Sequence, residues 1–531
     1  MVSWLAWLVL VGPGALLVSA VIARRAPGFR PARAIRAGTA ATWVGVAVAV
    51  SAGAATASQG LIQSTTFGPN YLGVSVRLDA LSTVMFAMIA LLGVIIYRYS
   101  CTYLDGDERQ GSFLVRLAIT IAAVEVVVLA GSLTVLVAAW IGTSLALHRL
   151  LLFYPDRRGA VIAARKKFIA ARLGDVLLIA GAVLLAAQFD SGNLEVIFEG
   201  AVAGVAAGTS SAATAAAALC LALAAILKSA QFPTHGWLVE VMETPTPVSA
   251  LLHAGILNAG PFLAIRMAFV MDQAGAANTL LIIVGGSTAV IASVVLLTQP
   301  SVKVALGYSS AAHMGFMLMI CGTGVYAAAL LHLVAHSFYK AHAFLSSGGA
   351  IDEARAAKVK LPARLGSPLR IAGSAAIALL LYAVVAAVWR VDLADEPILL
   401  VIGAILVLGT TQIVAPAFDS QGPLAGTLRV TLLAAGVTIS FFTLEAGAHH
   451  LLASAIPSDI ERSVWQYLPL AVIVAAFTTV VALQIAEPSR QPSARRRALA
   501  IHLRNGLYAN AVFDRFVGSL RPMPASSEAT R

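Results

Sequence analysis

Three features of the sequence predict an all-α polytopic membrane protein with about fifteen transmembrane helices. Of the 531 residues, 59% are hydrophobic and only 11% are charged, whereas a soluble domain carries about 25% charged residues. The hydrophobic residues form runs of roughly 20, the length that crosses the bilayer core as a helix. A proline-rich, charged stretch in the middle of the chain interrupts this pattern and predicts a broken helix.

The predicted spans follow one another from the N-terminus to residue 486. They cover residues 2–23, 37–57, 78–98, 113–130, 132–153, 168–188, 213–231, 247–270, 278–298, 302–322, 325–347, 370–389, 397–416, 428–446 and 467–486. The first span lacks a basic leading segment and a small-residue cleavage site, so we expect it to be retained as a helix and not removed as a signal peptide.

The basic residues gather in alternate connections between spans. Residues 24–36, 148–167, 352–370 and 490–504 are strongly basic, whereas 189–200 carries three carboxylates and no base. Because Lys and Arg are enriched in cytoplasmic loops, we expect a bacterial cell (inner) membrane protein with its N-terminus outside and its C-terminus in the cytoplasm. The net charge of +11 then reflects topology, and nucleic acid is not an expected partner.

The sequence offers no pattern for a bound metal, nucleotide or redox group. The three cysteines are far apart, and there is no phosphate-binding glycine loop. We therefore expect no cofactor in this chain and no catalytic residue.

Several ionisable residues fall inside predicted spans, where each costs at least about 2.5 kcal/mol to insert. They form the candidate ion pathway: Glu125, Asp175, Lys228, His253, Lys303, His332, His336 and Lys340. His332, His336 and Lys340 are spaced i, i+4, i+8 and share one helical face, an arrangement that suits a proton relay. Hydrogen bonding between packed helices is the alternative for the histidines, and Lys303 could instead extend to the membrane surface.

Three prolines explain the interruption near residues 228–247. Pro233, Pro245 and Pro247 exclude one continuous helix, so we expect a short segment around 236–242 and a new helix from 246 to 253. Broken helices at membrane depth recur at transporter ion sites. The polar and aromatic side chains after the break are expected to line an aqueous vestibule or dock a partner, ordinary loop charge being the alternative: His235, Trp237, Glu240 and Glu243.

The stretch KSAQFPTHGWLVEVMETPTPVSALLHAG (228–255) resembles the signature of the antiporter-like subunits shared by respiratory complex I and the multisubunit Na⁺/H⁺ antiporters. RLDALSTVMFAMIALLG (77–93) and QPSVKVALGYSSAAHMGFM (299–317) extend the resemblance. It implies two inverted repeats of five helices, each with a broken helix. It also implies roles in the pathway: Lys228 as the mid-membrane lysine, Asp175 as its acidic partner, His253 as the next relay group, and Lys303, His332, His336 and Lys340 as the linking relay.

The resemblance divides the chain into five parts. They are N-terminal helices (1–76), a first repeat with the break (77–270), a second repeat (271–446), a C-terminal helix (447–489) and a basic amphipathic tail (490–531). Two departures stand out: Trp140 is followed by Ile141 where the family has a Trp-Glu pair, and 371–428 contains no lysine. Glu125 is a candidate substitute for the missing glutamate, and the second repeat is expected to be degenerate.

Further segments resemble one branch of the family, the DabB-type membrane subunits of DAB inorganic-carbon accumulation complexes. TSLALHRLLLFYPDRRGAVIAARKKFIAARLGD (143–175) and LRNGLYANAVFDRF (503–516) carry this resemblance. It implies a non-enzymatic subunit in which H⁺ or Na⁺ flow drives CO₂ hydration to bicarbonate by a cytoplasmic, zinc-containing, carbonic-anhydrase-like partner of the DabA type. The alternatives are a subunit of a cation/proton antiporter or of a complex I-like oxidoreductase, and a membrane scaffold that only anchors the partner.

The tail supports a partner independently of the resemblance. Leu503, Leu507, Val512 and Phe516 recur at roughly helical spacing in a basic segment. Such a helix could lie on the membrane surface or dock a cytoplasmic subunit, and the resemblance favours docking.

Overall fold

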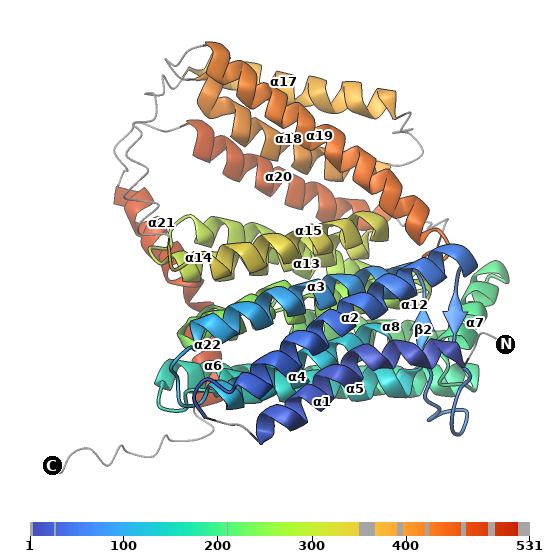
Figure 1. The fold of residues 1–531 in the computed structure, drawn as a ribbon. Coiled ribbons are helices and arrows are strands. Elements are labelled where there is room, and N and C mark those ends of the chain that lie inside the picture. Colours follow the sequence, from blue (N-terminus) through green and yellow to red (C-terminus); the bar gives the residue numbers. More distant parts are fainter. Residues whose placement is uncertain are drawn as a thin grey trace.

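A computed structural model describes residues 4–25, 28–209, 211–349, 367–389, 397–419, 424–457, 464–486 and 494–518. Nearly all of them are helical (Figure 1). The helices of the first half are η1 (Leu5–Leu10), α1 (Val11–Arg24), α2 (Ala32–Gln59), α3 (Ala80–Tyr103), α4 (Gln110–Val128), α5 (Leu133–Leu151), α6 (Arg158–Phe189), α7 (Leu194–Ala206), α8 (Ala212–Lys228), α9 (Gly236–Glu240), η2 (Val241–Glu243), α10 (Thr246–Ala254), η3 (Ile256–Asn258), α11 (Ala259–Arg266) and α12 (Ala268–Met271). Those of the second half are α13 (Gly275–Leu296), α14 (Val302–Gly322), α15 (Tyr326–Leu345), α17 (Pro368–Val388), α18 (Pro397–Phe418), α19 (Leu424–Leu452), α20 (Val464–Ala486), α21 (Ala494–Arg504), η4 (Gly506–Tyr508) and α22 (Ala509–Gly518).

The predicted all-α membrane architecture is confirmed. In the described part of the chain, 13 helices are long and apolar enough to cross a membrane, and each coincides with a predicted span. The remaining two predicted spans are also helices. The first, α8, is short at 17 residues, and the second, α15, is less apolar because it carries His332, His336 and Lys340.

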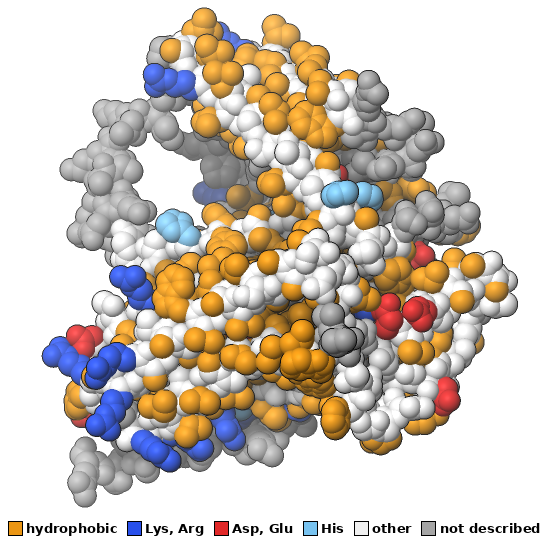
Figure 2. Space-filling view, turned by 45° about the vertical axis from the view of Figure 1, so that its right-hand side comes forward, with side chains coloured by type: hydrophobic (Ala, Val, Ile, Leu, Met, Phe, Trp, Pro, Cys, Tyr) orange, Lys and Arg blue, Asp and Glu red, His pale blue; other side chains and the backbone are white. Residues whose placement is uncertain are grey.

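The long helices lie side by side in one bundle (Figure 1). Helices α1–α6 form one side of it, α13–α15 the middle, and α17–α20 the opposite side. On the face drawn in Figure 2, Lys and Arg gather at one end of the bundle, and most Asp and Glu lie toward the other end. Apolar side chains cover the surface between the two ends, as a lipid-facing surface requires.

The break expected in each repeat is present only in the first among the described residues. After residue 367, α17, α18, α19 and α20 each run without interruption, although α18 contains Pro416 and α20 contains Pro469. The basic connection 352–366 and the tail beyond 518 lie outside the described residues.

Two connections differ from the sequence-based expectation. The basic segment 148–167 is mostly helical, because α5 continues to Leu151 and α6 already begins at Arg158. The acidic segment 189–200 contains the start of α7, which Asn193 caps by accepting a hydrogen bond from the Glu195 amide. In both places an apolar helical pattern extends through residues whose charge suggested a loop.

A short hairpin and a buried charge cluster close the acidic end of the bundle. Strands β1 (Ile62–Gln63) and β2 (Arg77–Leu78) pair antiparallel. Asp79 then caps α3, and its carboxylate accepts hydrogen bonds from Arg77 at 2.7 Å and Arg266 at 2.6 Å. Burial alone would raise the pKa of Asp79, but the guanidinium groups of Arg266 and Arg77 outweigh it and hold the pKa well below its usual range.

Candidate ion pathway

The predicted proline break is confirmed almost residue by residue. Helix α8 ends at Lys228, the short helices α9 and η2 occupy Gly236–Glu240 and Val241–Glu243, and α10 starts at Thr246. A second interruption was not predicted. The expected span 247–270 is broken at Gly255, whose backbone angles (φ −121°, ψ −65°) are not helical, so that α10 gives way to η3 and α11.

Lys228 is buried at the end of α8, with 7% of its surface exposed. Its ammonium lies 4.6 Å from the centroid of the Trp140 ring on α5, a cation–π contact, and its Nζ has no hydrogen-bond partner among the described residues. A cavity of about 20 Å³ adjoins it on the side of Trp140 and Asn258, and one of about 10 Å³ on the side of Lys167 and Trp237. Since one water needs roughly 10–15 Å³, each cavity has about the space for one water beside this lysine.

Asp175 lies beside Lys228 but is not ion-paired with it in the described structure. Its carboxylate pairs instead with Arg172, one turn earlier on α6, at 2.6 Å. Helices α6 and α8 pack against each other at this depth, since a Cβ on Gly174 would lie 3.6 Å from Leu227 Cβ. The expected acid–base pair is therefore not direct, because the intrahelical arginine occupies the acid first.

Lys167 and Arg172 belong to the same polar group, although the sequence analysis placed Lys167 in a loop. Lys167 is 3% exposed, and its Nζ donates to the Ser144 carbonyl oxygen at 2.7 Å and to Ser144 Oγ at 3.0 Å. Arg172 also donates to Ser144 Oγ. Ser144 follows Trp140 by one turn of α5, so this helix contacts Lys228 through an aromatic ring and Lys167 through a hydroxyl. The sequence could have indicated that Lys167 is helical, because the apolar helical pattern of the next span already begins near residue 160.

Glu125 is buried on α4, at 1% exposure, but it faces α2. Its Oε1 lies 3.5 Å from the position that a Cβ on Gly45 would take. Among the described residues no ion pair joins it to Lys228, and it does not line the cavities beside that lysine, although Val124, Val127 and Val128 do. The geometry thus gives no support to Glu125 as a replacement for the missing fifth-span glutamate.

His332, His336 and Lys340 share one face of α15, as their spacing predicted, and in the structure this stripe meets α14. Lys340 donates to Ser309 Oγ at 2.7 Å and to the Leu306 carbonyl oxygen at 3.2 Å. One and two turns earlier, His336 and His332 approach His313 of α14. A hydrogen bond of 2.9 Å joins His313 Nδ1 and His332 Nε2.

The three histidines form a compact group whose ring nitrogens lie within 4.8 Å of one another. It is the one cluster of potential metal ligands found in the described part of the chain. Three imidazoles can bind a metal such as zinc, and they can also pass a proton between rings. His313 is not among the residues that the sequence assigned to the pathway. Its role emerges from α14 and α15 packing together, which spacing on one helix cannot predict.

Asn258 links the cavity beside Lys228 to α15, and His253 contacts α15 as well. His253 on α10 is fully buried, and its ring stacks on Phe344 of α15 with centroids 4.3 Å apart. Asn258 on η3 lines the larger cavity beside Lys228 and donates to Ser337 of α15 at 2.7 Å. The sequence analysis missed Asn258, since only the break at Gly255 turns it toward both groups.

Lys303 lies in the first turn of α14 and donates to Thr246 Oγ1 at 3.3 Å. Thr246 is the first residue of α10. Lys303 therefore ties the start of the helix after the break to α14, and it is half-buried and not extended into solvent.

The residues expected at a vestibule or docking face are largely covered. His235 and Trp237 are each 3% exposed. Glu243 accepts a hydrogen bond from the Ala160 amide at the start of α6, and Glu240 pairs with Lys166 at 2.7 Å. Of the four, Glu240 is half-buried and Glu243 is exposed, so only Glu243 is presented as surface.

The chain's own tail covers the break. Asn510 of α22 donates to Glu240 Oε1 at 2.6 Å, and its own Oδ1 accepts from Lys166 Nζ at 3.0 Å. Asp514, one turn further along α22, is also ion-paired with Lys166. Gly236 permits this approach, because a Cβ there would lie 1.8 Å from Asn510 Oδ1. The apolar residues Val512 and Phe516 remain 55% and 73% exposed.

The chain matches known families of membrane subunits. Residues 130–386 match the family model described as "NADH:quinone oxidoreductase/Mrp antiporter, TM", and residues 66–114 match the one described as "NADH-Ubiquinone oxidoreductase (complex I), chain 5 N-terminus". The chain is 38% identical to the probable inorganic carbon transporter subunit DabB2 of Halothiobacillus neapolitanus, over 84% of this chain and 81% of that protein. It is 36% identical to the probable subunit DabB of Hydrogenovibrio crunogenus, over 73% of each chain.

A solved structure shares the fold. A chain of the Mrp complex from Dietzia sp. superposes with a TM-score of 0.56 at 22% identity, covering 97% of this chain and 56% of that one. This likeness concerns the helical architecture alone.

Proposed function

This chain belongs to the DabB family of inorganic carbon transporter subunits, within the wider family of complex I and Mrp antiporter membrane subunits, and we propose that it conducts protons to drive inorganic carbon accumulation. The observation that carries the proposal is the line of buried polar groups through α8, η3, α10, α14 and α15. Its members are Lys228 with its cavities, Asn258 and His253 against α15, and Lys340 and the three histidines between α14 and α15. Buried groups of this kind in a membrane protein mark ion routes.

The chemistry of the groups favours protons over Na⁺. Na⁺, a hard cation, is bound by oxygen ligands such as backbone carbonyls, whereas this line consists of amines, imidazoles, an amide and hydroxyls. The nearest carboxylate, Asp175, is held by Arg172. Histidine and a desolvated lysine gain and lose protons at neutral pH. No cofactor is needed in this chain for such transfer.

The proposed partner is a cytoplasmic, zinc-containing, carbonic-anhydrase-like subunit of the DabA type. The exposed apolar face of α22, with Val512 and Phe516, offers it a docking surface. In this arrangement the basic end of the bundle and the C-terminus face the cytoplasm, and the N-terminus lies outside. Zinc and the hydration of CO₂ belong to the partner, so this chain itself is not an enzyme.

The position of the tail suggests how proton movement reaches the partner. Lys228 ends the helix that enters the break. After the break, Glu240 of α9 pairs with Lys166 of α6, which also pairs with Asp514 of the tail. A change in the protonation of Lys228 changes the charge at one end of the short segment between Lys228 and Glu240. The other end carries the surface on which the partner docks.

Sensitivity to the proton gradient tests the proposal. Cells that express this chain with its partner are expected to accumulate bicarbonate and to lose that ability when a protonophore collapses the gradient. A Na⁺ ionophore applied at constant proton gradient is expected to have little effect. Accumulation that continues in the protonophore would contradict the proposal and indicate a scaffold, and loss only with the Na⁺ ionophore would identify Na⁺ as the coupling ion.

A further inference from the structure

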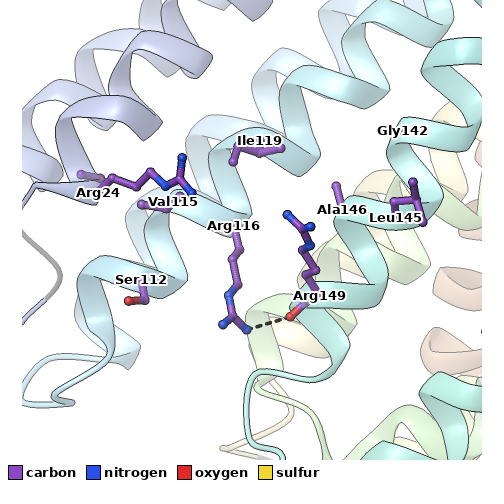
Figure 3. Close-up of a pocket in the computed structure, with 10 residues that line it drawn as sticks. Arg24, Ser112, Val115, Arg116, Ile119, Gly142, Leu145, Ala146 and Arg149 are labelled. Atoms are coloured by element: carbon purple, nitrogen blue, oxygen red, sulfur yellow. Dashed lines mark hydrogen bonds between the residues drawn. The ribbon is translucent and has the colours of Figure 1, made fainter.

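A groove between α1, α4 and α5 lies apart from the ion pathway, at the basic end of the bundle. Its volume is about 620 Å³, within the range of small-molecule sites. Figure 3 shows Arg24 of α1, Arg116 of α4 and Arg149 of α5 around it. Arg24 and Arg149 lie at the C-terminal ends of α1 and α5, and Arg116 lies near the N-terminal end of α4. This is the depth where a membrane protein meets lipid headgroups.

The three arginines bring positive charge without an acidic counterpart. None of them takes part in an ion pair among the described residues, and no carboxylate lines the groove. Arg30, at the same end of the bundle, is by contrast paired with Asp105. Arg116 is held in place by donating to the Arg149 carbonyl oxygen at 2.8 Å, a bond drawn in Figure 3. The Arg116 guanidinium also lies 5.5 Å from the centroid of the Phe153 ring. Within the described part of the chain, the three arginines keep N–H donors that can bind an anion.

The rest of the groove is apolar and continues along the helices. Val115, Ile119, Gly142, Leu145 and Ala146 line it. Ile119 and Leu145 are 37% and 43% exposed, so the floor is open on the side that faces lipid. A free phosphate ion would use the arginines and leave this floor empty.

We infer that the groove binds an anionic phospholipid of the bilayer, with its phosphate between Arg116, Arg149 and Arg24 and an acyl chain along the apolar floor. Arginine matches phosphate geometry through paired N–H donors. Basic pockets between transmembrane helices on the cytoplasmic side recognise anionic headgroups in this way. The bound lipid would bridge α1, α4 and α5 and neutralise the three neighbouring cations.

Native mass spectrometry of the purified full chain tests this site, with phosphatidylglycerol and phosphatidylcholine of the same acyl chains as probes. Phosphatidylglycerol is expected to be retained in preference to phosphatidylcholine. Arg116→Gln and Arg149→Gln should each weaken its retention about fivefold. The matched control is Arg33→Gln, which removes an exposed arginine at the same end of the bundle but outside the groove and should leave retention unchanged.

A second variant separates a built site from general attraction to positive charge. Gly142→Leu keeps all three arginines and fills the floor, and a Cβ at Gly142 meets no atom within 4 Å, so the helix can accept it. It should also reduce retention. Equal retention of the two lipids, an equal loss in Arg33→Gln, or full retention in Gly142→Leu would overturn the inference. So would a photoreactive side chain at position 119 that crosslinks to the partner subunit and not to phospholipid.

Discussion

Helices α3–α15 and helices α17–α20 are similarly apolar, but they differ in how much of their surface is buried within the protein. In the window from Thr246 to Arg266, 94% of the residues are buried, whereas the corresponding windows of α17–α20 are only 17–33% buried. The first region contains the buried pathway groups. In the second, α18 and α20 contain no Asp, Glu, Lys, Arg or His at all, and the last lysine of the chain is Lys360.

This difference separates two roles within one membrane protein. Buried charge is tolerated only where other helices supply partners or water-sized space. The first region supplies an aromatic ring and small cavities beside Lys228, and hydrogen-bond partners beside the α15 stripe. Helices α17–α20 pack on α13 and α15 and expose most of their surface to lipid or to another subunit. We therefore expect variants in the first region to abolish function and variants in the second to leave it almost unchanged.

The largest expected effect concerns stability at the acidic end of the first region. Asp79→Ala leaves Arg77 and Arg266 buried without their shared carboxylate, and breaking a buried ion pair costs about 3–5 kcal/mol. Arg429→Gln, at an exposed arginine of α19, should change stability by no more than about 0.5 kcal/mol. Thermal unfolding of both variants in the same detergent measures the two losses of stability. Equal losses would contradict the expected difference between the two regions.

The next effect concerns proton movement through the histidine group. His336→Ala removes a buried ring beside His313 and His332 and should lower proton flux by about tenfold or more. His450→Ala removes an exposed histidine at the end of α19 and should leave flux unchanged. A pH-sensitive dye inside proteoliposomes reports both. Normal flux in His336→Ala would exclude this ring from the route.

A smaller effect concerns the tail, which docks on the first region alone among the described contacts. Lys166→Met removes the ammonium that joins Glu240 to Asp514 and should weaken partner binding about tenfold, since about 1.4 kcal/mol corresponds to that factor. Arg165→Met, one residue earlier on α6, is the matched control. Co-purification of the partner and proteolysis of residues 494–518 provide the readout. Unchanged binding in Lys166→Met would show that the partner does not depend on this contact.

The sequence alone predicted the helical spans and the proline break because both depend on local rules. Apolar length determines a span, and proline excludes a continuous helix. The α15 stripe was predictable for the same reason, since i, i+4 spacing fixes a shared face.

Features that depend on packing between helices were not predictable in this way. The direction of Glu125 toward α2 and the approach of His313 to α15 are set by which helices adjoin. The ion pair of Arg172 with Asp175, by contrast, lies within α6 at i, i+3 spacing, which the sequence already contains. The coverage of Glu240 by the tail joins residues 270 positions apart. The charge of Lys166 and Lys167 predicted a loop, although both side chains are buried in α6 against their hydrogen-bond partners.

Lys228→Ala gives the most direct test of the central claim that cation movement past this lysine drives inorganic carbon accumulation. The matched control is Thr411→Val, which removes a buried hydroxyl from α18 at nearly constant volume. Bicarbonate accumulation is measured in cells where co-purification shows that each variant still assembles with the partner. The account predicts that accumulation is abolished in Lys228→Ala and retained in Thr411→Val. Full accumulation by an assembled Lys228→Ala complex would contradict it.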